Sequence, residues 1–170
     1  MTRHYPMLLA LLLVAGCGEP SAPVAAPPEA SSVATATGPR MESHSWKGRC
    51  EGTSRFTSPS TLAISGTCQF AHAGRLALLS RETINGFALS AENRYTSPNG
   101  DVLLTTSEGS YVPLPDFSGV TFSGIETVVG GTGRFSGAAG SATRIGRTAF
   151  GSPNVGSYEL EGTLTLDHAP

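Results

Sequence analysis

The chain has 170 residues, of which 39% are hydrophobic and 14% charged, and its formal net charge is −2 at pH 7. From Met41 onward it carries nine Lys or Arg and eleven Asp or Glu, so the part that can fold is close to neutral. No basic stripe of the kind typical of nucleic-acid-binding proteins is present, and we expect no nucleic acid among its partners.

Residues 1–16 are predicted to be a bacterial lipoprotein signal peptide. The apolar run MLLALLLVA at residues 7–15 is too short to span a bilayer, which takes about 20 residues. It leads into Gly16-Cys17, which resembles the lipoprotein signal, where the cysteine receives lipid and becomes the first residue. The alternative is an ordinary secretory signal that contains a cysteine. Lipidation of Cys17 would anchor the chain in the bacterial cell envelope, and Gly18, which is not a retention signal of the Asp type, favours the outer membrane.

Residues 17–42 are predicted to be a lipid-anchored, flexible linker rich in Pro and Ala. Residues 18–40 hold five of the twelve prolines of the chain and few large apolar side chains. Such a segment cannot bury enough surface to offset the entropy of ordering it. Its prolines favour a semi-extended tether that holds the next domain away from the membrane.

Residues 43–170 are predicted to form an all-β domain. No run of a dozen residues has helical periodicity, and turn signals recur about every ten residues, which is typical of a sandwich or a barrel. The predicted strands lie at residues 46–56, 61–70, 72–81, 86–96, 101–111, 119–129, 133–148 and 155–167. A closed antiparallel barrel of eight strands has an interior just wide enough for side chains or one small ligand.

The first two predicted strands carry the two cysteines that remain besides Cys17. If the hairpin between them is symmetric about Pro59, Cys50 faces Cys68 and Phe56 faces Leu62. An even pair of cysteines in an exported protein indicates a disulfide. Two buried thiols are the alternative.

The segment GGTGRF contains Gly130, Gly131, Thr132, Gly133, Arg134 and Phe135. A dinucleotide-binding loop would need glycine at position 136, which is Ser, and a helix after it. No Lys follows the last glycine, so a Walker loop is excluded as well. We therefore predict a hairpin turn here, which Arg134 holds in place.

Two segments resemble a known family of barrels. VVGGTGRFSGAAGSA at residues 128–142 resembles the segment shared by dirigent proteins and barrels related to plant allene oxide cyclase. GTCQFAHAGRL at residues 66–76 resembles a glycine-rich strand of exported bacterial relatives, with Cys68 where a glycine would be usual. The likeness covers most of residues 60–167 and implies an antiparallel eight-stranded barrel. Function transfers poorly from fold alone.

Four residues are candidates for lining a pocket: Trp46, His72, Glu108 and Glu126. His72 continues the alternation of the strand before it and falls opposite Trp46, and the two glutamates share faces with apolar neighbours. An inward carboxylate would have a raised pKa and could act as an acid or a base. The alternatives are a core histidine with a backbone partner and rim carboxylates, because glycines and bulges can reverse the alternation.

No catalytic residue is assigned, and we expect neither a metal nor a cofactor. The chain has no G-x-S-x-G elbow, no CxxC and no two histidines at metal-ligand spacing. We expect an envelope lipoprotein whose barrel binds a small apolar ligand or a partner. The alternatives are a cyclase- or isomerase-like enzyme acting on a hydrophobic substrate inside the barrel, and a purely structural spacer. Clustered inward polar groups would favour the enzyme, and a filled barrel the spacer. The oligomeric state stays open.

Overall fold

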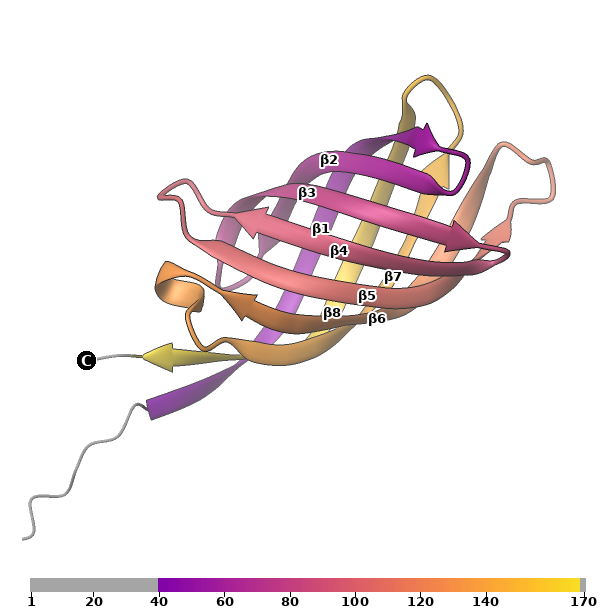
Figure 1. The fold of residues 1–170 in the computed structure, drawn as a ribbon. Coiled ribbons are helices and arrows are strands. Elements are labelled where there is room, and N and C mark those ends of the chain that lie inside the picture. Colours follow the sequence, from indigo (N-terminus) through magenta and orange to yellow (C-terminus); the bar gives the residue numbers. More distant parts are fainter. Residues whose placement is uncertain (1–39, 169–170) are drawn as a thin grey trace, which may run out of the picture. The chain divides into compact units, whose positions relative to one another are not determined.

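The structure, a computed structural model, describes residues 40–168. Eight antiparallel strands form a closed barrel, in which each strand pairs with the next and β8 returns to pair with β1 (Figure 1). The elements are β1 (Arg40–Ser58), β2 (Thr61–Phe70), β3 (Gly74–Asn85), β4 (Ala88–Thr96), β5 (Val102–Pro113), β6 (Gly119–Gly131), the 3-10 helix η1 (Gly133–Phe135), β7 (Ala139–Ala149) and β8 (Asn154–His168). The closed eight-stranded barrel predicted from the sequence is confirmed.

The predicted signal peptide, Cys17 and the linker up to residue 39 lie outside the described residues. β1 begins at Arg40, ahead of the domain boundary expected at residue 43, and Arg40 pairs with His168 at the end of β8. Across residues 40–168, no helix is long and apolar enough to cross a membrane.

The β1–β2 hairpin has the predicted register. Cys50 pairs with Cys68 and Phe56 pairs with Leu62, with an irregularity only beyond Phe56, next to the turn. The two cysteines form a disulfide, with their Cα atoms 4.0 Å apart, and both side chains are buried. The even-numbered residues of both strands face the interior, because strand side chains alternate between the two faces of a sheet. The predicted disulfide is confirmed.

The two ends of the barrel differ in their loops. Antiparallel strands place the β1–β2, β3–β4, β5–β6 and β7–β8 hairpins at one end, which we call the mouth end. The other end, which we call the η1 end, carries the β2–β3 and β4–β5 loops and η1, at the left of Figure 1.

The η1 end is closed by the GGTGRF segment. Phe135 is fully buried in the core there, and Arg134 lies over its ring at 4.7 Å. The Arg134 guanidinium donates to the carbonyl of Ala73 at 2.7 Å and lies 3.8 Å from the carboxylate of Asp101. Arg134 therefore ties three loops together and holds the turn, as predicted.

The mouth half of the barrel is less filled than the η1 half. Three of the aromatic core side chains, Trp46, Phe70 and Phe135, gather toward the η1 end. Toward the mouth, Gly52 occupies an inward position, where a Cβ would come within 2.5 Å of the Ser65 carbonyl oxygen across the hairpin. A glycine at such a position lets neighbouring strands approach closely and leaves the space in front of it free of a side chain.

Candidate ligand site

A cavity of about 150 Å³ opens at the mouth end. Its wall is largely apolar and includes Ile64, Ile84, Leu89, Val120 and Phe122. These side chains come from four strands, and most of their neighbours along the strands are exposed, so the period of two in the sequence builds the wall.

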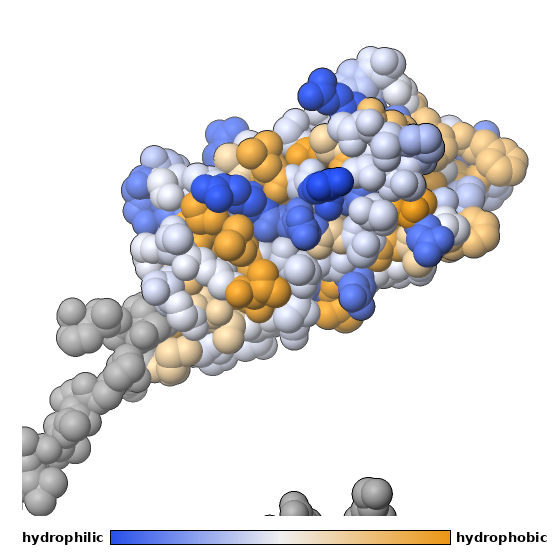
Figure 2. Space-filling model, viewed as in Figure 1, coloured by the Kyte–Doolittle hydropathy of each residue, from blue (hydrophilic) through white to orange (hydrophobic). Residues whose placement is uncertain are grey.

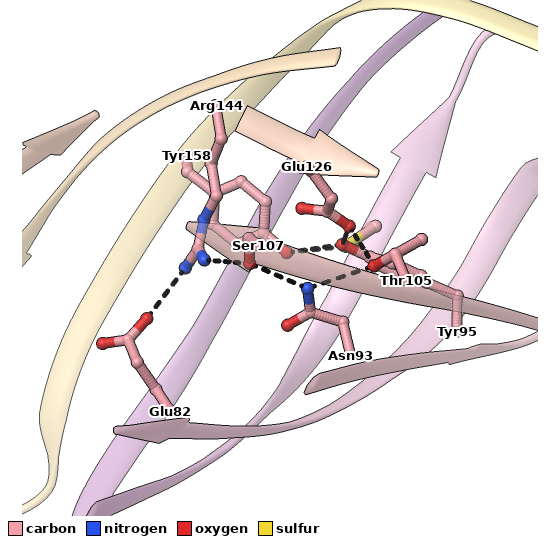
Figure 3. Close-up of polar contacts among 9 residues, drawn as sticks. Glu82, Asn93, Tyr95, Thr105, Ser107, Glu126, Arg144 and Tyr158 are labelled. Atoms are coloured by element: carbon pink, nitrogen blue, oxygen red, sulfur yellow. Dashed lines mark hydrogen bonds and ion pairs between the residues drawn. The ribbon is translucent and has the colours of Figure 1, made fainter. Parts of the chain in front are cut away.

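The inner part of this cavity is lined by Glu82, Arg144 and Tyr158. The Arg144 side chain is buried between two aromatic rings, with its Cζ 4.8 Å from the centre of Phe122 and 4.5 Å from that of Tyr158. Its Nη2 lies 3.4 Å from Glu82 Oε2, and its Nη1 donates to Ser107 Oγ at 3.1 Å (Figure 3). Within residues 40–168, Arg144 Nε has no hydrogen-bond partner.

A second polar group, Glu126, lies in the core beyond the inner part of the cavity and is fully buried. Its Oε1 accepts hydrogen bonds from the hydroxyls of Tyr95 at 2.5 Å and Thr105 at 2.6 Å. The Tyr95 hydroxyl also lies 3.0 Å from that of Tyr158. Glu126 is thus connected by hydroxyl groups to a residue that faces the cavity.

Asn93 closes a network between the two acidic groups. Its amide donates to Thr105 Oγ1 at 3.1 Å and to Ser107 Oγ at 3.0 Å. Because Thr105 contacts Glu126 and Ser107 contacts Arg144, one hydrogen-bonded chain crosses the barrel interior, as Figure 3 shows. Networks of this kind fix the positions of their members.

Burial favours the neutral forms of the acidic groups. It raises the pKa of Glu126, against the hydrogen bonds from Thr105 and Tyr95 and the charge of Arg144, which lower it. Burial likewise raises the pKa of Glu82, against the charge of and hydrogen bond from Arg144. The pKa values of Tyr95 and Tyr158 are also raised, first by burial, so both hydroxyls keep their protons.

The four pocket candidates have different positions. Glu126 faces the interior, and Trp46 is a core residue at the η1 end. His72 is exposed in the β2–β3 turn, 5.5 Å from the ring of His44, because β2 ends at Phe70 and its alternation does not continue.

Glu108 is exposed on the outer face of β5, so its expected inward position is wrong. Glu108 shares a face with Leu104, as expected, but this face is the outer one, because Leu104 is exposed. Val102 is misleading as a guide to the inner face, because Val102 and Leu103 are both buried at the start of the strand. From Leu103 onward the odd-numbered residues of β5 face inward.

Glu82, Arg144 and Tyr158 were not predicted as a group from the sequence. Glu82 shares a strand face with Leu78 and Ile84, and Arg144 shares one with Ala142. The alternation of residues along each strand therefore predicts that both side chains point inward. The contact between them across the barrel could not be predicted, because it depends on how strands far apart in the chain are placed relative to one another. Among the described residues, no three His, Cys, Asp or Glu gather as a possible metal site.

No protein-family model matches this chain. No curated protein matches it either. Among solved structures, it is similar to the pterocarpan synthase dirigent protein GePTS1, over 76% of this chain and 93% of that chain, with a TM-score of 0.51 and 11% sequence identity. At this identity the likeness concerns the fold alone. The chain therefore has a barrel fold similar to that of a dirigent protein.

Proposed function

We propose that this protein binds a small, largely apolar molecule in the cavity at the mouth end of its barrel. The observation that supports this most strongly is the uneven filling of the barrel, packed at the η1 end and open toward the mouth. An apolar cavity of about 150 Å³ is large enough for one benzene-sized ring. The ligand is therefore one ring or short branched chain, or the end of a longer molecule that extends through the mouth.

The bound molecule carries an acceptor group at its inner end. Among residues 40–168, Arg144 Nε is buried without a hydrogen-bond partner, and an unsatisfied buried donor costs about 1 to 3 kcal/mol. A carbonyl, ether or carboxylate oxygen near Arg144 would offset this cost. The rest of the molecule would contact the apolar wall.

We further propose that the barrel is held at a bacterial membrane, the outer membrane in particular, through lipid on Cys17. The apolar run at residues 7–15 and the small residues before Cys17 support this. Labelling with a fatty acid tests it: the wild type should incorporate the label and Cys17→Ser should not. Equal incorporation would contradict the anchor and leave the cavity proposal untouched.

The binding proposal is tested by mass spectrometry of what co-purifies with the tag-free chain from its native host. A variant that fills the cavity, Ile64→Trp, should lose the bound molecule. Ile145→Trp, on the exposed outer face of β7, is the matched control and should keep it. Retention of the same molecule by both variants would contradict binding in the cavity.

An enzyme acting on a hydrophobic substrate is the second candidate, because the inward polar groups are clustered. Glu82 and Tyr158 line the cavity, so a carboxyl group and a phenol that could take part in proton transfer stand beside any bound molecule. Incubation of the identified ligand with the protein distinguishes the two functions. Conversion by the wild type and loss of conversion in Glu82→Gln, with binding kept, would establish the enzyme. Unchanged recovery from the wild type would establish a binding protein.

A further inference from the structure

Each of the four hairpins at the mouth end displays a phenylalanine. Phe56 lies beside the β1–β2 turn, Phe87 in the β3–β4 turn, Phe117 in the β5–β6 loop and Phe150 in the β7–β8 loop. All four side chains are more than half exposed. Figure 2 shows hydrophobic residues at the outermost points of this end, at the right. We call these four residues the aromatic rim.

The loops that carry the rim have almost no charge. Residues 59–60, 86–87, 114–118 and 150–153 contain one ionisable side chain, Asp116, whose Oδ1 accepts hydrogen bonds from the backbone and hydroxyl of Ser118. The loops at the η1 end carry His72, Asp101 and Arg134 instead. The hairpin loops of the mouth end are therefore nearly uncharged, although the exposed Arg55 precedes Phe56 in β1.

Phe117 is exposed and has an unfavourable backbone conformation. Its φ is 56°, in the left-handed region that bulky residues avoid, and its side chain is 76% exposed. A glycine would adopt this conformation without steric cost. The loop thus keeps an aromatic ring at its tip, where a smaller residue would fit more easily.

We infer that the aromatic rim docks on a lipid surface, with the four rings in the interfacial layer and the cavity mouth facing the lipid. Aromatic side chains favour the headgroup level of a bilayer, whereas charged groups are costly to bring into it. Because the cavity opens at the same end, an apolar molecule could enter it from the lipid without crossing water. Entry of a ligand from the lipid rests on the proposed function, and so does the reach to the membrane, which depends on the proposed lipid on Cys17. The affinity of the rim for lipid is argued separately, from the exposure of its four rings.

The chain ahead of the barrel has the reach that this docking requires. The 22 residues from 18 to 39 span at most about 70 Å when extended. β1, with 19 residues, is at most about 65 Å long. A chain held at Cys17 can therefore present the mouth end to the same membrane, although β1 begins at the η1 end.

The test measures how deeply the rim enters a bilayer. The chain has a single tryptophan, Trp46, which is buried at the η1 end. Phe117→Trp adds a reporter on the rim, and Leu79→Trp adds one at an exposed apolar position on the outer wall. The full chain is reconstituted in phosphatidylcholine vesicles with and without brominated acyl chains, which quench indole fluorescence on contact.

We expect brominated lipid to quench the Phe117→Trp protein beyond the wild type and the Leu79→Trp protein to match the wild type. The quenching should persist in high salt, because no ion pair takes part. Equal quenching of the two variants, or none in Phe117→Trp, would overturn the inference. So would a dimer, seen by sedimentation, that Phe117→Gly dissociates, because the rim would then join two copies of the chain.

A second reporter separates docking from folding. Phe87→Trp should be quenched as Phe117→Trp is, and adding Phe117→Gly should reduce that quenching while raising the melting temperature. Reduced quenching together with a lowered melting temperature would count against docking. Ligand retention is measured separately, so loss of lipid contact with the ligand retained overturns only this inference.

Discussion

At the scale of single residues, Glu126 is the side chain whose position has the clearest thermodynamic consequence. Its pKa in the folded protein is raised above the ordinary value of 4.5, first by burial. Between these two values the folded protein holds a proton that the unfolded chain has released. Stability therefore falls as the pH rises through that window, by about 1.4 kcal/mol for each unit of raised pKa.

Glu126→Gln should remove this dependence, because the amide keeps an acceptor for Tyr95 and Thr105 and cannot ionise. Urea unfolding at a series of pH values is the measurement. From pH 4.5 upward we expect a shallower loss of stability in the variant than in the wild type, with Glu82 supplying part of the remaining slope. The same exchange at the exposed Glu108 controls for the loss of one charge. Parallel curves for wild type and Glu126→Gln would contradict the assignment.

The inward direction of single residues was only partly predictable from alternation. It held for Glu126, which lies in an unbroken stretch of β6. It failed for Glu108, because Val102 and Leu103 are both buried at the start of β5, and for His72, because β2 ends before it. Bulges and strand ends depend on pairing with other strands, so a single strand's pattern does not reveal them.

At the scale of elements, the β1–β2 hairpin was the most predictable part of the fold. The alternation of apolar residues and the facing of Cys50 and Cys68 both pointed to one register, which the structure has. A buried face specifies the register strongly, because a slip by one residue would move every apolar side chain of the strand from the core face to the solvent face.

Replacing Cys50 and Cys68 together by Ser should destabilise the barrel by less than about 3 kcal/mol, the chain-entropy value for a loop of this length. The hairpin already restrains the same loop, so the full value is not reached. Denaturant unfolding of both proteins gives the difference, and thiol counting on the unreduced wild type confirms the bond. An unchanged midpoint would show that the disulfide contributes nothing to stability.

The loop around η1 was predicted to be a turn, but it was not predicted to close one end of the barrel. Gly133 has φ 58°, and a Cβ there would collide with the Asp101 carboxylate, whose partner Arg134 ties the loops together. Gly133→Val should therefore destabilise by about 1 to 3 kcal/mol. Gly100→Val, also at a positive φ but with open space around it, separates the two causes. If both variants lose the same stability, the collision adds nothing to the backbone strain.

At the scale of the whole molecule, closure of the sheet followed from the strand count and from the family resemblance, whereas the cavity did not. The cavity depends on how inward residues from several strands add up at one level of the barrel. Gly52 and Gly156 leave space near the mouth, while Phe70 and Phe135 fill the other end. A sequence predicts whether a side chain points inward or outward more readily than it predicts the height along the barrel at which side chains from distant strands lie.

A bound ligand should stabilise the entire barrel, because the unfolded chain has no cavity. At a free concentration one hundred times the dissociation constant, the gain is about 2.7 kcal/mol, measured as a rise in melting temperature. Ile64→Trp should show no rise, whereas Ile145→Trp should respond as the wild type does. A rise in both variants would place the ligand outside the cavity.

The seam between β1 and β8 has a consequence for how the chain folds. Arg40 pairs with His168, so the first and last described strands must meet before the sheet can close. Contacts between such distant segments form slowly, because the entropy of closing the loop is lost before the contacts form. Until β8 arrives, one edge of β1 has unpaired backbone groups, which are a template for pairing with another chain. A chain that stops short of β8 would therefore be expected to aggregate through β1, although its first hairpin is already fixed by a covalent bond.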